Sequence, residues 1–139
     1  MVRRLQEPPK EGGRRIRAHD SPNVSPQQMR PKFSFEHLRR SHCLSNCEKD
    51  EKAALADRLH EMSQLTWQQI AQSHKKGQGY EILSRDTITG DAIPDFITED
   101  INIISFRFCS KAPMVGFRDA EVFYLVWLDR AFNLYDHGA

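Results

Sequence analysis

Residues 113–137, near the end of the 139-residue sequence, most constrain the fold because they read as antiparallel strands in close succession. Val122 to Leu128 is unbroken by proline or glycine and is rich in β-branched and aromatic residues, a composition typical of strands. Val115 to Arg118 predicts a strand before it, and Asn133 to Tyr135 predicts a short strand after it. The links between these segments are short, which suits antiparallel neighbours.

Ile101 to Cys109 predicts a further strand, and this segment is apolar on both of its faces. A strand of this kind belongs inside a sheet rather than at its edge. Arg107 lies in the middle of it. Because a buried guanidinium without a partner is costly, we expect Arg107 either to be paired or to open onto a cleft.

Two helices are predicted between residues 49 and 73. Lys49 to Met62 gathers its apolar residues on one face, at Ala54, Leu55, Leu59 and Met62. Thr66 and Gln69 have the spacing of a capping box, which marks the start of a second helix. Gly77 and Gly79 are expected to end it.

Helices that precede most of the strands indicate an α+β fold. We expect the helix pair to pack on one face of a small antiparallel sheet, with short additional strands at 33–35 and 80–83. Residues 33–139 are predicted to form a single domain. Residues 1–32 are expected to be a disordered, basic tail, because they hold five of the seven prolines and eight Lys and Arg residues but almost no large apolar ones.

Composition excludes several classes of protein. The sequence has no run of about 18 apolar residues, so we expect no membrane span. Three cysteines, an odd number, favour a reducing, cytoplasmic environment over a disulfide framework. His42, Cys43 and Cys47 suggest zinc, but a structural zinc needs four ligands and no second cluster follows. We therefore expect neither a metal nor another cofactor, and a zinc-stabilised adaptor is a third alternative resting on these residues alone.

Three short motifs follow one another in the second half of the chain: Phe106-Arg107-Phe108, Gly116-Phe117-Arg118 and Leu134-Tyr135-Asp136-His137. In this order, and after a helix pair, residues 33–139 resemble the RelE/ParE superfamily of small bacterial toxins. The resemblance implies a helix pair on a curved antiparallel sheet. It also implies the toxin of a toxin–antitoxin system that acts as a metal-independent RNA endonuclease (an mRNA interferase). Its partners would be an antitoxin protein and RNA or the ribosome.

Cleaving RNA through its 2′-hydroxyl needs a general base, a general acid and a cation for the phosphorane charge. The resemblance implies that these residues are catalytic: Arg107, Arg118, Tyr135 and His137. The two arginines would clamp the phosphate. The phenol or the imidazole would transfer a proton, with the imidazole favoured because it titrates near neutrality and with Asp136 orienting it. The resemblance further implies that RNA is bound by Lys75, Lys76 and Lys111. The four catalytic side chains must then meet in a single cleft.

The charge of the domain favours a second hypothesis. Residues 33–139 hold twelve Lys and Arg residues against sixteen Asp and Glu residues, whereas phosphate neutralisation supplies most of the affinity for RNA. One scaffold also hosts several activities. The alternative is therefore a non-catalytic binding or regulatory module on the same fold, either an inhibitor of a protein target such as gyrase or a phage-encoded regulator.

Overall fold

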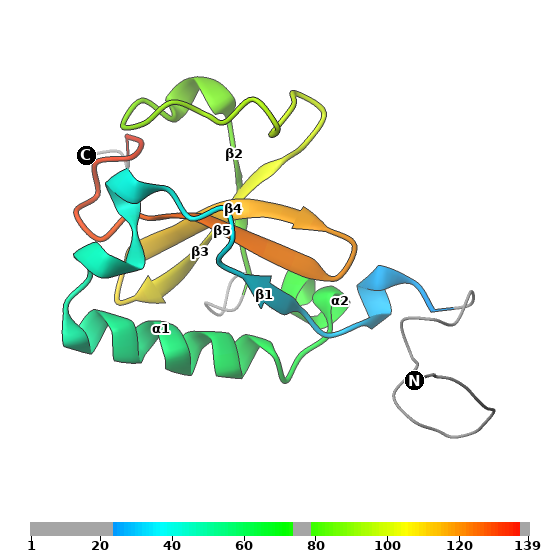
Figure 1. Cartoon of the computed structure of the whole chain (residues 1–139). Helices are drawn as coiled ribbons and strands as arrows, with labels where there is room; N and C mark the ends of the chain where they lie inside the picture. Colours follow the sequence, from blue (N-terminus) through cyan, green and yellow to red (C-terminus); the bar gives the residue numbers. More distant parts are fainter. Residues whose placement is uncertain (1–23, 74–78, 137–139) are drawn as a thin grey trace, which may run out of the picture.

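A computed structural model of the chain describes residues 24–73 and 79–136. It is an α+β fold in which a five-stranded sheet lies between a helical layer and a layer of irregular chain (Figure 1). The larger part of the expected tail lies outside the described residues. A short 3-10 helix at Pro26–Gln28 contacts the second helix, so the packed part of the chain begins ahead of the predicted boundary at Phe33.

The sheet has the strand order β1-β5-β4-β3-β2. The strands are β1 (Lys32–Ser34), β2 (Glu81–Leu83), β3 (Ile103–Cys109), β4 (Ala112–Asp119) and β5 (Val122–Leu128). β2, β3, β4 and β5 pair antiparallel, and β3 is an interior strand, as its two apolar faces predicted. β1 pairs parallel with β5, so the expectation of a wholly antiparallel sheet is wrong. β1 is separated from the other strands by the helices, and no hairpin forces it into the antiparallel direction.

The last predicted strand, Asn133 to Tyr135, is not a strand. Tyr135 forms a single antiparallel bridge with Ile88. The backbone N–H groups of Asn133 and Leu134 instead donate to the carboxylate of Asp129, at 2.8 and 3.1 Å. Because a backbone donor engaged by a side chain cannot also serve a ladder, the segment stays irregular.

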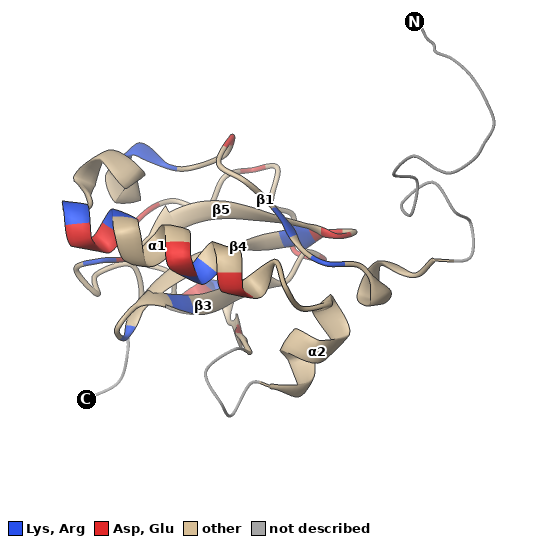
Figure 2. Ribbon diagram, turned by 90° about the horizontal axis from the view of Figure 1, so that it is seen from below, with Lys and Arg blue, Asp and Glu red and all other residues tan. Residues whose placement is uncertain are grey.

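Both predicted helices are present. They are α1 (Lys49–Met62) and α2 (Trp67–Gln72). The predicted capping box is confirmed, since the Thr66 hydroxyl accepts from the Gln69 amide and the Gln69 side chain accepts from the Thr66 amide. Acidic and basic residues both occur along α1 (Figure 2), and Leu55 and Met62 of the same helix are buried. None of the helices within 24–73 and 79–136 is long and apolar enough to cross a membrane.

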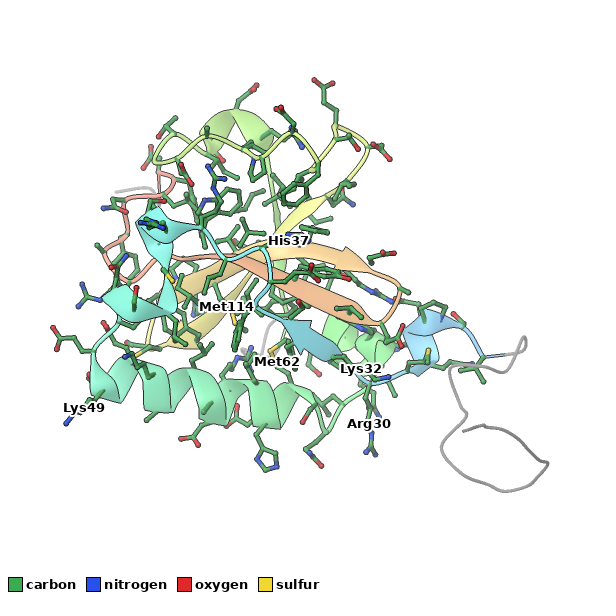
Figure 3. All side chains as sticks on the ribbon, in the orientation of Figure 1. Arg30, Lys32, His37, Lys49, Met62 and Met114 are labelled. Atoms are coloured by element: carbon green, nitrogen blue, oxygen red, sulfur yellow. The ribbon has the colours of Figure 1, made fainter. Side chains whose placement is uncertain are left out.

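Two apolar cores lie on opposite faces of the sheet. The first contains residues of both helices, and Met62 of α1 lies near Met114 of β4 between helix and sheet (Figure 3). The second core joins Val115, Val126 and Trp127 to residues of the segment 84–101 and to Leu134. Residues 86–94 are polar and contain the turn-forming pair Gly90-Asp91, a composition typical of a loop. This loop nevertheless contributes Ile88 to the second core, so the sheet is covered on both faces.

Asp91 fastens this covering segment to the sheet. Its Oδ2 atom accepts from Arg39 Nε at 2.9 Å and from the buried Trp127 Nε1 at 3.0 Å. The Arg39 guanidinium, helped by the Trp127 indole, holds the pKa of the Asp91 carboxyl well below its usual range, although partial burial acts in the opposite direction. The ionised carboxylate therefore ties three distant segments together.

We predict that Asp91→Asn lowers the free energy of unfolding at neutral pH by about 1–3 kcal/mol, because the charge-assisted bonds are lost. The folded-state pKa lies below the unfolded value, so the carboxylate stabilises the fold fully above that value, about 4, and loses its effect as the pH falls. Urea unfolding at a series of pH values measures this. Asp86→Asn, an exposed carboxylate on the same segment, is the matched control. A pH-independent difference between wild type and Asp91→Asn contradicts the prediction.

Gly116 sits at a register shift between β4 and β5. A Cβ atom added there would lie 1.8 Å from the carbonyl oxygen of Tyr124, which is backbone and cannot rotate away. We predict that Gly116→Ala destabilises the fold by about 2–4 kcal/mol, measured by denaturant unfolding. In the adjoining turn, Ala120 has φ 54°, a conformation that glycine adopts more easily than alanine. Ala120→Gly should therefore raise the free energy of unfolding, by up to about 1 kcal/mol. Equal stability of wild type and Gly116→Ala would count against the close approach.

Candidate functional site

A cleft of about 910 Å³ lies where β2, β3 and the C-terminal segment meet. We call it the β2–β3 cleft. Its lining is rich in groups that bind or transfer protons and in cations: Glu81, Ser84, Thr87, Ser105, Arg107, Lys111, Tyr135 and Asp136. A concave site with several convergent polar groups is the usual form of a binding or catalytic site.

The pairing of β2 with β3 places three of these side chains, those of Glu81, Ser105 and Arg107. Glu81 of β2 is the cross-strand partner of Ser105 of β3, so both side chains project from the same face of the sheet. Arg107 lies two residues beyond Ser105 and shares that face. Arg107 is exposed and lines the cleft. Of the two alternatives expected from the sequence, pairing or opening onto a cleft, the structure shows the second.

The backbone around Arg107 is held from the opposite side of the sheet. Arg58, which is buried on α1, donates from Nε to the Arg107 carbonyl oxygen at 2.8 Å. This carbonyl is next to the β-bulge between Arg107 and Cys109, where the ladder is interrupted. The helix therefore satisfies a backbone acceptor at the bulge, while alternation along β3 puts the Arg107 side chain on the side of the cleft.

Tyr135 reaches the cleft because its neighbour is anchored. Leu134 is fully buried in the second core, and Asp129, also fully buried, accepts the backbone N–H groups of Asn133 and Leu134. Because both the side chain and the backbone N–H of Leu134 are held in place, Tyr135 is positioned beside β3, where its phenol contacts Ser105. Lys111 enters from the turn between β3 and β4, where Ser110 has φ 53°.

The electrostatics of Tyr135 connect the members of the site. Burial raises the pKa of its phenol above the ordinary value, and the nearby carboxylates of Glu81 and Asp129 act in the same direction. A hydrogen bond with the Ser105 side chain and the charge of Arg107 act in the opposite direction. Tyr135 therefore stays protonated at neutral pH, which suits a group that donates a proton rather than one that removes it.

Arg118, predicted to share this site, lies elsewhere. Its guanidinium carbon is 4.3 Å from the centre of the Trp67 ring, on the helix-bearing face of the sheet. Its Nε donates to the Ala120 carbonyl oxygen at 2.6 Å. β4 turns this side chain to the face opposite that of Arg107, so the requirement that both arginines meet in one cleft is not met.

Of the remaining predicted residues, Lys111 lines the β2–β3 cleft, and so does Asp136. Lys75, Lys76 and His137 lie outside the described residues. Sequence reasoning missed Glu81 and Ser105. Ser105 could have been predicted, because it lies two residues from Arg107 on β3 and therefore shares its face. Glu81 can be assigned to the site only when the register of β2 is known.

The zinc alternative rested on His42 and two cysteines. His42 is buried and lies 2.8 Å from both the Ser41 hydroxyl and the Asn133 side-chain oxygen. Within the described ranges, no three His, Cys, Asp or Glu side chains are grouped so as to hold a metal ion.

Comparison of the chain with protein-family models, with curated proteins and with solved structures found no match.

We predict that Ser105→Ala raises the pKa of Tyr135 further, because the hydrogen bond that favours the ionised phenol is removed. Nuclear magnetic resonance titration of ring-labelled tyrosine in the full chain measures it. Ser84→Ala, which also removes a hydroxyl from the cleft lining, is the matched control and should leave the titration unchanged. A Tyr135 pKa that falls in Ser105→Ala would contradict the proposed arrangement.

Proposed function

We propose that the chain is the toxin of a toxin–antitoxin pair, that it cleaves RNA without a metal, and that the β2–β3 cleft is its active site. The single observation that supports this most is the meeting of two cations, Arg107 and Lys111, with the protonated phenol of Tyr135 in one cleft. The RelE/ParE-like order of motifs supports it independently. The proposed protein partner is an antitoxin, the proposed target is RNA alone or on the ribosome, and the proposed location is the cytoplasm.

The proposed reaction is attack by the ribose 2′-oxygen on the adjacent phosphorus, with departure of the 5′-oxygen of the next nucleotide. Glu81 is the proposed general base, since its carboxylate lies close enough to Tyr135 to raise the phenol's pKa. Tyr135 is the proposed general acid and protonates the departing oxygen. Arg107 and Lys111 stabilise the negative charge that grows on the phosphorus oxygens. No redox change or cofactor enters these steps.

Of the four catalytic residues implied by the resemblance, this proposal keeps Arg107 and Tyr135, and it adds Glu81 and Lys111. The proposal gives Arg118 no part in the chemical step, because its guanidinium lies against Trp67 and Arg118 does not line the cleft. Asp136 lines the cleft and is proposed to orient the polar groups around Tyr135.

We predict that Tyr135→Phe lowers the rate of RNA cleavage by about 10²-fold or more, because the departing oxygen loses its acid. Arg107→Gln should lower it by about 10²-fold, since a donor to the transition-state charge is removed. Mapping of new RNA 3′ ends, with purified protein and in cells, measures both effects. Chelators should leave the wild-type rate unchanged.

Lys49→Gln is the control for loss of one positive charge, because Lys49 lies at the start of α1 (Figure 3) and does not line the cleft. It should cleave RNA at the wild-type rate. Full cleavage by Tyr135→Phe, with a folded protein confirmed by its thermal transition, would overturn the proposed mechanism.

A second candidate function is supported by the excess of acidic residues over residues 33–139. It is a non-catalytic module that inhibits a protein target such as gyrase or acts as a phage-encoded regulator. Expression with and without the neighbouring reading frame separates the two functions. Growth arrest without new RNA ends favours a protein target, whereas arrest with new ends that disappear in Tyr135→Phe favours the endonuclease.

A further inference from the structure

We propose that Arg118 forms a second phosphate-binding site, outside the β2–β3 cleft, and that an RNA strand held in the cleft passes over β2 to reach it. This inference rests on the proposed endonuclease function. It assigns Arg118 to substrate binding and not to the chemical step.

The first observation is the way Arg118 is held. Its guanidinium stacks on Trp67, which is buried in α2, and its Nε donates to the Ala120 carbonyl oxygen at 2.6 Å. These contacts use one face of the group and one of its nitrogens. The two terminal nitrogens have no ion-pair partner among residues 24–73 and 79–136, although the group is partly buried and its pKa is lowered by that burial. A preoriented, partly desolvated cation without a carboxylate favours binding of an anion.

The second observation is a hollow at this arginine. Its volume is about 550 Å³, and Arg118 lines it together with Tyr80, Ile82 and Asn102. The two terminal nitrogens of a planar guanidinium match the two non-bridging oxygens of a phosphodiester. Tyr80 and Ile82, the latter 60% exposed, add an apolar surface beside it against which a nucleobase can pack.

The third observation connects the two hollows. Tyr80 and Ile82 line both the hollow at Arg118 and the β2–β3 cleft. β2 is an edge strand of only three residues, with its outer side unpaired within the described chain. The cleft lies on one face of the sheet and Arg118 on the other, so the path between them runs around this short edge. A flexible, single-stranded polyanion can follow such a path, whereas a rigid duplex cannot.

One feature opposes anion binding at this site and supplies a test. Asp100, whose carboxylate accepts a hydrogen bond from the Thr98 hydroxyl, also lines the hollow. Its negative charge weakens the attraction of the hollow for phosphate. Removal of this charge should therefore strengthen RNA binding, and a gain in affinity cannot result from misfolding.

The test measures binding of two RNAs by the full chain carrying Tyr135→Phe, so that cleavage does not interfere. A trinucleotide fills only the cleft, and an oligonucleotide of about ten nucleotides also reaches Arg118. We expect Arg118→Gln to weaken the longer RNA about fivefold and to lower its salt dependence by about one phosphate contact, with the trinucleotide unchanged. Asp100→Asn should strengthen the longer RNA about twofold, again with the trinucleotide unchanged. Arg118→Lys should fall between Gln and wild type, and Lys49→Gln is the charge control.

The outcomes separate this inference from the function on which it rests. If the trinucleotide binds in an Arg107-dependent way but Arg118→Gln leaves the longer RNA unaffected, the second site is overturned and the cleft remains. If Arg118→Gln weakens both RNAs equally, Arg118 acts on the cleft itself and the inference is also wrong. If neither RNA binds, both proposals fail. In that case, Arg118-dependent binding of an acidic peptide would assign the hollow to a protein partner.

Discussion

The candidate site depends on the hydrogen bonds that the buried carboxylate of Asp129 accepts from the backbone of the C-terminal segment. Asp129 ends β5 with no exposed surface and accepts the backbone N–H groups of Asn133 and Leu134, while His42 Nε2 lies 3.8 Å from its Oδ1 atom. A carboxylate in such a position is stable only when several donors surround it. The two backbone donors belong to the C-terminal segment, and His42 belongs to the segment after β1. The same group therefore fixes where the chain turns back over the sheet and where Tyr135 is placed.

Much of the fold could be predicted because its signals are local. The boundaries of α1 and β5, and the capping box of α2, follow from spacing and residue type within a few residues. The parallel pairing of β1 could not be predicted, because it depends on a contact between residues 32–34 and 122–124. The role of the segment 84–101 was also hidden, since its polar composition indicates a loop while its few apolar residues, Ile88 and Ile97 among them, build the second core.

The candidate site shows the same division. Arg107 was predictable as a cation that must be paired or open onto a cleft, because its strand is largely apolar. Arg118 and Arg107 looked equivalent in sequence, yet they lie on opposite faces. Arg107 pairs with Pro113, and Arg118 is an odd number of residues farther along β4. Glu81 belongs to a strand too short to reveal its register from sequence. Contacts across the sheet, rather than the motifs themselves, decide which of these charges share a cleft.

The two tryptophans of the chain are placed one in each core. Trp67 donates its indole N–H to the Glu121 carbonyl oxygen, while Trp127 donates to the Asp91 carboxylate. Each indole thus reports on a different layer of the molecule, one beneath the helices and one beneath the covering loop. Because a carboxylate and a carbonyl perturb an indole differently, single-tryptophan forms of the protein carry two separate optical signals for the loosening of its two faces.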